Sequence, residues 1–197
     1  MGNIIKKKNS LTEKDVVQQT KQWINDVVIA LNFCPFAKSV FEKGLICYRA
    51  ANNKNLEEDL FSMLALCKEL DQNIELETGF IIYPSSYQDF DDYLDFLELA
   101  NQLLVEQQYD GIYQLASFHP DYCFDNTELN ASENFTNRSP YPMLHIIRES
   151  SLEKALESYN NPEEIPVRNI ETANSKGAEF FKAALEGIKN TKKIESD

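Results

Sequence analysis

The sequence is poor in histidine, cysteine and positive charge, and each shortage excludes a class of function. Its 197 residues include 2 His and 4 Cys, and 32 acidic against 19 basic residues give a formal net charge of −13. Without a basic stripe to neutralise phosphates, the protein is not expected to bind nucleic acid. The uneven spacing of the cysteines is not typical of a disulfide framework.

Long apolar runs and familiar catalytic motifs are also missing. No stretch approaches the roughly 20 apolar residues that span a membrane, and lysines follow Ile5 too soon for a signal peptide. A Gly-rich phosphate loop, a nucleophile elbow and a His-Glu-x-x-His sequence are absent. We therefore expect a cytoplasmic protein with reduced thiols and no membrane contact.

The composition is otherwise that of a globular protein, with 43% hydrophobic residues. A chain of this length can bury roughly two thirds of its unfolded surface in one core. We predict a single domain over residues 11–190, preceded by a flexible tail (1–10) and followed by a frayed C-terminus (191–197).

Hydrophobic periodicity and capping residues divide the chain into alternating helices and strands. A capping box at Thr12 and Asp15 opens a first helix, which Pro35 interrupts. Helices are then predicted over residues 35–42, after Asn55, after Asp89, over residues 151–159 and from Asn169 onward. Strands are predicted over residues 45–50, 78–83, 112–118 and 143–148.

This order predicts an α/β (or α+β) fold with a mixed four-stranded sheet. Helices link the first three strands, and strand-helix-strand units make parallel strands with right-handed crossovers. The last two strands are expected to pair antiparallel, while N- and C-terminal helices flank the sheet. In open α/β sheets, ligands bind at the carboxyl ends of strands, which is where His119 lies.

Cys34 is the first candidate for chemistry. It precedes Pro35 at a predicted helix start, where backbone N–H groups and the helix dipole favour a thiolate and lower its pKa. The alternative is a small buried residue at a corner between helices, since free cysteine is commonly interior.

The long polar loop between the last two strands holds the other candidates. Its aromatic residues predict an ordered loop, and Asp121 could orient the His119 imidazole as a general base needs. His145 lies within the last strand, where a core histidine is the alternative. Arg138 could offer a bidentate fork to a carboxylate or phosphate, and the prolines after it make the segment rigid.

Metal binding is a further possibility. Cys34, His119, Cys123 and His145 would form a Cys2His2 set suited to zinc, although no Cys-x2-Cys pair exists. Asp121 could replace Cys123 in such a site. Zinc or another divalent metal is therefore a possible cofactor, and none is strongly implied.

Four segments together are similar to one bacterial family, a domain of unknown function, number 1415. They are Asn32-Phe33-Cys34-Pro35-Phe36-Ala37, Ser117-Phe118-His119-Pro120-Asp121-Tyr122, Thr136-Asn137-Arg138-Ser139-Pro140-Tyr141-Pro142-Met143-Leu144-His145 with Arg148-Glu149, and Arg168-Asn169-Ile170. The resemblance brings no known activity, cofactor or substrate. It implies that the motif positions are Cys34, His119, Asp121, Asn137, Arg138, His145 and Arg148. Cys123 departs from the family, whose members often carry glutamine there, and this weakens the Cys2His2 set.

The leading hypothesis is a small enzyme that acts on an anionic small molecule. Cys34 or a bound water would be the nucleophile, His119 oriented by Asp121 the general base, and Arg138 or Arg148 the anion clamp. The candidate catalytic residues are Cys34, His119, Asp121 and His145, and the candidate substrate-binding residues are Tyr122, Asn137, Arg138, Ser139, Tyr141 and Arg148. The alternatives are a metal-binding protein using Cys34, His119, Asp121 and His145, and a non-enzymatic module that docks a partner on the loop.

Overall fold

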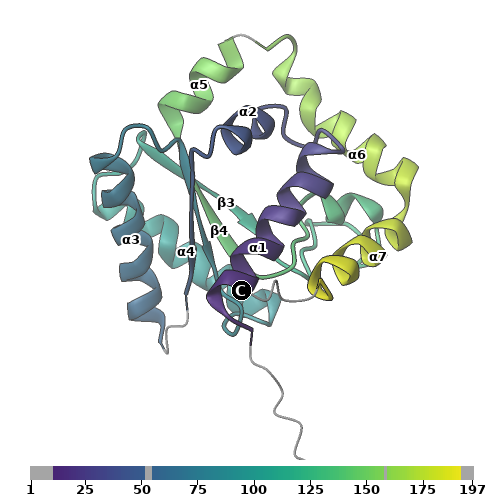
Figure 1. Ribbon diagram of the computed structural model, residues 1–197, viewed down its shortest axis with the longest axis horizontal. Coiled ribbons are helices and arrows are strands. Elements are labelled where there is room, and N and C mark those ends of the chain that lie inside the picture. The colour runs from purple at the N-terminus through teal and green to yellow at the C-terminus, as the bar shows by residue number, and fades with distance from the viewer. Residues whose placement is uncertain (1–10, 52–54, 158, 192–197) are drawn as a thin grey trace, which may run out of the picture.

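A computed structural model describes residues 11–51, 55–157 and 159–191 of the chain. The predicted tail over residues 1–10, and all but the first residue of the predicted C-terminal segment, lie outside the described residues. Helices cover both faces of a four-stranded sheet, giving three layers (Figure 1). None of the helices in the described part combines the length and apolar character needed to cross a bilayer.

The sheet is mixed, as predicted. Its strands are β1 (Ile46–Ala50), β2 (Thr78–Ile82), β3 (Tyr113–Phe118) and β4 (Met143–Arg148), in the spatial order β1-β2-β4-β3. β1 and β2 are parallel, and β4 runs antiparallel to both of its neighbours. β4 thus lies between β2 and β3, and the long loop joins the neighbouring ends of β3 and β4, where Phe118 pairs with Met143.

The first helix and the two helices between the first three strands that carry predicted caps, α3 and α4, begin where those caps predict. α1 (Glu13–Trp23) starts with the capping box of Thr12 and Asp15. Asn55 accepts a hydrogen bond from the Glu58 N–H before α3 (Leu56–Gln72), and Asp89 accepts from two N–H groups of α4 (Phe90–Glu106). Each cap satisfies N–H groups that a helix start leaves without partners.

Each face of the sheet carries its own hydrophobic core. α3 and α4 cover one face, where they pack on Ile81, Leu144 and Ile146. The other face is covered by α1 and by helices from the C-terminal part, which enclose Phe80, Ile82 and Met143 (Figure 1). The alternation of strand side chains between two faces accounts for this division, and Trp23 is buried in the second core as predicted.

The helices depart from the prediction in four places. α1 continues into a π-helix, η1 (Ile24–Ile29), and the next helix, α2, spans Ala37–Glu42 instead of starting at Pro35. α5 (Glu149–Glu157) follows β4 directly. The single C-terminal helix predicted from Asn169 is wrong: α6 (Ile165–Lys176) and α7 (Ala178–Lys189) are separated by Gly177, whose φ of +79° no helix accommodates.

A buried tyrosine, Tyr93, connects the ends of β3 and β4 at the point where the long loop begins and ends. The Tyr93 hydroxyl donates to the Met143 carbonyl at 2.8 Å and accepts from the Phe118 N–H at 3.2 Å. It therefore bridges the ends of β3 and β4, and the residues that follow diverge from the sheet there. Two short 3₁₀ helices complete the elements of the described residues: η2 (Ser132–Thr136) in this loop and η3 (Pro162–Glu164) before α6.

Candidate functional site

The loop between β3 and β4 is ordered around one buried asparagine. The Asn134 side chain is 0% exposed and donates to the Glu128 carbonyl at 2.9 Å. Its Oδ1 accepts from the Phe124 N–H at 3.0 Å and the Thr127 hydroxyl at 2.9 Å. Sequence reasoning missed this role, because nothing in a run of polar residues distinguishes the asparagine that turns inward.

Arg138 holds the same loop together from the other side. Its guanidinium donates to the Tyr122 carbonyl at 2.9 Å and to the Leu129 carbonyl at 2.7 Å, and it lies 4.6 Å from the Phe135 ring centroid. Burial lowers the pKa of Arg138, and the charge of Asp121 opposes that effect. The main chain of the loop therefore engages the side chain that was expected to bind an anion.

Arg148 likewise binds main-chain oxygens. Its guanidinium donates to the Leu70 carbonyl at 2.6 Å and the Leu76 carbonyl at 3.2 Å, and it packs over Tyr113. Leu70 belongs to the last turn of α3, whose carbonyls have no partner within the helix. Arg148 thus caps α3 on the face covered by α3 and α4.

His119 is buried, and both of its ring nitrogens have partners. Nδ1 accepts from the Asp121 main-chain N–H at 3.0 Å, and Nε2 donates to the Tyr87 carbonyl at 2.8 Å. An N–H only donates and a carbonyl only accepts, so the ring is neutral with its proton on Nε2. This main-chain contact replaces the predicted one from the Asp121 carboxylate. Burial lowers the pKa of His119 below its ordinary value.

His145 is also a neutral histidine within a packed layer. Its ring stacks on Phe80 with centroids 4.0 Å apart, and Nε2 lies 2.6 Å from the Thr78 hydroxyl. Because that hydroxyl donates to the Ile146 carbonyl at 2.5 Å, Nε2 must donate to it. Burial lowers the pKa of His145 to about 3.

The predicted catalytic residues are distributed over both sides of the sheet. The His119 ring packs on Phe90 and Tyr93 of α4, whereas His145 stacks in the opposite layer. Within residues 11–51, 55–157 and 159–191, no three His, Cys, Asp or Glu side chains are grouped as a metal site requires. The alternative metal set of Cys34, His119, Asp121 and His145 is therefore not assembled.

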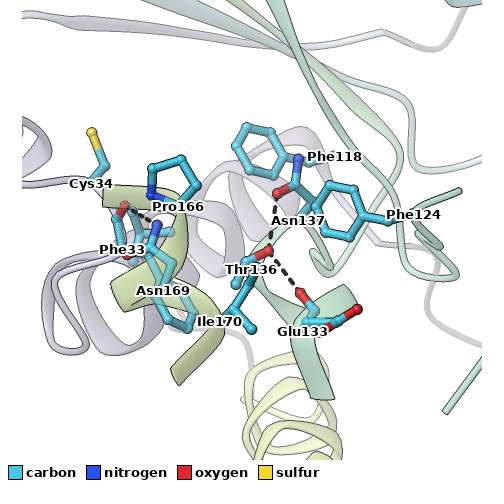
Figure 2. A pocket seen from close by; sticks show the side chains of 11 residues that line it. Phe33, Cys34, Phe118, Phe124, Glu133, Thr136, Asn137, Pro166, Asn169 and Ile170 are labelled. Carbon is cyan, nitrogen blue, oxygen red and sulfur yellow. Dashed lines mark hydrogen bonds between the residues drawn. The ribbon is translucent and has the colours of Figure 1, made fainter. Parts of the chain in front are cut away.

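The described residues do form a cavity of about 460 Å³ on the face opposite α3 and α4. Three segments that are far apart in sequence enclose it: the corner between η1 and α2, the end of β3 with its loop, and the first half of α6. The lining is mostly apolar and comprises Val28, Phe33, Cys34, Phe118, Phe124, Glu133, Thr136, Asn137, Pro166, Asn169 and Ile170. Figure 2 shows Phe118, Phe124 and Asn137 on one side, with Phe33 and Cys34 on the other.

Of the candidate catalytic residues, Cys34 alone lines the cavity. Its thiol stands at the edge of the group in Figure 2, beyond Pro166 and directed away from Asn137. The N–H groups of Phe36 and Ala37 lower the pKa of the thiol, but desolvation by burial is the larger effect and raises it above 9.0. The net direction of the pKa shift is opposite to the predicted one, because desolvation of the thiol outweighs the effect of the two N–H groups.

Asn137 is the predicted substrate-binding residue that reaches the cavity. Its Nδ2 donates to the Ser117 carbonyl at 3.2 Å, and its Oδ1 lies 3.3 Å from the Thr136 hydroxyl. The main-chain carbonyl of Asn137 accepts from the His119 N–H at 3.3 Å. These bonds attach the loop to the end of β3 and orient the amide beside the cavity.

The other candidate substrate-binding residues make internal contacts and do not line the cavity. The Ser139 hydroxyl donates to the Tyr141 carbonyl at 2.6 Å, and the Tyr141 hydroxyl donates to Gln19. The Tyr122 ring packs against Phe90.

Sequence reasoning did not place α6 at this site. Its Asn169 donates through Nδ2 to the Phe33 carbonyl at 2.7 Å, and this bond closes the cavity wall beside Cys34 (Figure 2). The one available signal was that Phe33 and Asn169 both belong to the segments that carry the family resemblance.

The fold and the site together define a three-layer α/β protein with an open apolar cavity beside its sheet. The family comparison then identifies the chain, which belongs to the family described as protein of unknown function (DUF1415). The family model matches residues 15–183, so it covers the four strands and all three segments around the cavity. No curated protein and no solved structure matches the chain.

Proposed function

We propose that the protein binds a small organic molecule in the cavity between η1, the β3–β4 loop and α6. The observation that carries this proposal is the cavity itself. Its volume of about 460 Å³ lies within the range of roughly 300–1,000 Å³ that is typical of ligand sites. A mostly apolar lining with a few polar groups is also usual for such sites.

The backbone around the cavity supports the same proposal. The π-helix η1 contributes Val28 to the lining, and π-helical turns occur frequently at functional sites. Directly after it, Asn32 has a φ of +55°, which turns the chain toward Phe33 and Cys34. An irregular helix end thus positions one wall of the site.

Filling the cavity tests the proposal. Titration with a neutral, environment-sensitive dye such as Nile red should give saturable one-to-one binding to the wild-type protein. Ile170 lines the cavity and is 39% exposed, so Ile170→Trp should place an indole there and weaken binding about tenfold or more. Val167→Trp is the matched control, because Val167 is exposed on the same helix and does not line the cavity.

The melting temperatures of both variants should match that of the wild type within a few degrees. If Ile170→Trp and Val167→Trp weaken dye binding equally, or if neither variant affects it, the dye binds outside the cavity. A wild-type protein that does not bind the dye would contradict the proposal.

Catalysis is the second candidate function, with Cys34 as nucleophile. The observation that favours it is the pair of N–H groups, from Phe36 and Ala37, that stabilise the thiolate. The rate of alkylation by iodoacetamide as a function of pH, with Cys34→Ser as the control, tests it. An apparent pKa near 7 would favour catalysis, and a value above 9 would favour a binding role alone.

An anionic substrate is not part of this proposal, because Arg138 and Arg148 both bind main-chain carbonyls. We propose a cytoplasmic location for the protein. Its four cysteines are all free thiols, which agrees with a reducing compartment.

A further inference from the structure

We infer that the cavity selects an aromatic ligand that is uncharged or positively charged and carries a hydrogen-bonding group for the Asn137 amide. This inference rests on the proposed function, since it names the chemical class of the ligand in the same cavity. It concerns three properties of the lining: its charge, its rings and its amide.

The charge of the lining disfavours anions. Glu133 is the acidic residue in the lining, and no lysine or arginine belongs to it. The Cys34 thiol is neutral at pH 7, because burial raises its pKa. With a formal net charge of −13 on the whole protein, an anion would lose its hydration and gain no cationic partner.

Two guanidinium groups lie near the lining residues in sequence, but both donate to protein oxygens. Arg168 follows Pro166 by two residues, but its guanidinium donates to the Tyr159 hydroxyl at 2.5 Å and the Asn32 carbonyl at 3.2 Å. Arg138 follows Asn137 and donates to two carbonyls of the loop. Neither side chain lines the cavity.

The rings of the lining favour a flat ligand. Phe33, Phe118 and Phe124 all contribute to the wall, and Figure 2 shows Phe118 and Phe124 on either side of the Asn137 amide. Aromatic rings pack on one another in stacked or edge-to-face geometry. The faces of the same rings also attract cations, so a positive charge on the ligand is tolerated where a negative one is not.

The Asn137 amide provides the polar contact. One of its two N–H groups donates to the Ser117 carbonyl, and Oδ1 receives a long contact of 3.3 Å from the Thr136 hydroxyl. That hydroxyl has its better acceptor in the Glu133 carbonyl at 2.8 Å. The amide therefore retains one N–H and most of its acceptor capacity. A ligand that offers one acceptor and one donor side by side, as a carboxamide does, complements this pair.

Three probes with the same ring system test the inference: 2-naphthamide, 2-naphthylmethylammonium and 2-naphthoate. Isothermal titration of each into the wild-type protein measures the dissociation constant. We expect the amide and the ammonium to bind about tenfold more tightly than the carboxylate. Equal or tighter binding of naphthoate would overturn the inference while leaving the proposed function intact.

Two further outcomes separate the inference from the proposed function. If the dye binds in the cavity and none of the three probes does, the ligand class is wrong and the binding site stands. If neither the dye nor any probe binds, the proposed function fails and the inference fails with it.

Reversing the charge of Glu133 tests whether the cavity lining itself sets the preference between the anionic and the cationic probe. Glu133→Lys places a cation at the cavity and should shift the preference between naphthoate and the ammonium about tenfold toward naphthoate. Glu106→Lys is the matched control, because it makes the same change of net charge on α4, which covers the other face of the sheet. Equal shifts in both variants would show that the overall charge sets the preference, and would overturn the inference.

Discussion

Replacing Arg138 by methionine separates a structural role for this side chain from the anion clamp that the sequence predicted. Methionine has a similar length and keeps an apolar contact with the Phe135 ring, but it cannot donate hydrogen bonds. The substitution therefore removes both bonds to the loop and leaves the carbonyls of Tyr122 and Leu129 without that partner.

The expected loss of stability follows from these two bonds. A hydrogen bond to a charged group contributes about 1.5–3 kcal/mol, and part of this is recovered because a buried charge no longer needs desolvation. We therefore expect Arg138→Met to lower the free energy of unfolding by about 3–5 kcal/mol. That is a large share of the roughly 5–15 kcal/mol that stabilises a typical domain.

Urea unfolding followed by circular dichroism measures the effect. Arg49→Met is the matched control, since Arg49 makes an exposed ion pair with Glu69 and such pairs contribute only about 0–1 kcal/mol. If Arg138 served only to bind a ligand, its buried charge would not stabilise the fold. Replacing it would then leave the free energy of unfolding unchanged or increase it. A loss below about 1 kcal/mol for Arg138→Met would therefore refute the structural role.

Three further predictions concern the packed layers. Because the pKa of His145 is about 3 in the folded protein and near 6.5 when unfolded, protonation favours unfolding between these values. The free energy of unfolding should fall as the pH drops from 6.5 toward 3, and His145→Phe should make it depend less on pH in urea titrations. An unchanged slope of this free energy against pH in the variant would show that His145 does not cause the dependence. Tyr93→Phe should cost about 1–3 kcal/mol, because the bridge between the strand ends is lost, and no change in the urea midpoint would argue against it. Gly79→Ala should destabilise by about 1–3 kcal/mol, since the new Cβ would lie 2.8 Å from Leu66; the double variant with Leu66→Val should recover part of the loss in the same assay.

Local signals in the sequence were sufficient for most of the secondary structure. The caps at Thr12, Asn55 and Asp89 were predicted correctly because a cap and its partner lie within three residues of each other. β4 has the predicted bounds, Met143–Arg148, because a mostly apolar run with two β-branched isoleucines follows a rigid proline segment. The break at Gly177 was also local information, but helical periodicity on both sides of it concealed the interruption.

The roles of the polar residues were much less accessible. Arg138 and Arg148 carry the same charge whether they bind a ligand or a carbonyl, and the carbonyl of Leu70 is 78 residues away from Arg148 in the sequence. His119 likewise finds its second partner, the Tyr87 carbonyl, 32 residues earlier. Such partners are created by the packing of the layers, so no local pattern distinguishes them.

The sequence by itself determined the class of fold, the mixed sheet and its flanking helices, because periodicity and capping act over a few residues. It also singled out the segments around Cys34, Asn137 and Asn169 through their family resemblance. Only the tertiary structure decided that these segments enclose one cavity and that both histidines lie outside its lining. The physical reason is that burial and hydrogen-bond partners depend on which elements pack together, and β4 lies between β2 and β3 through contacts distant in sequence.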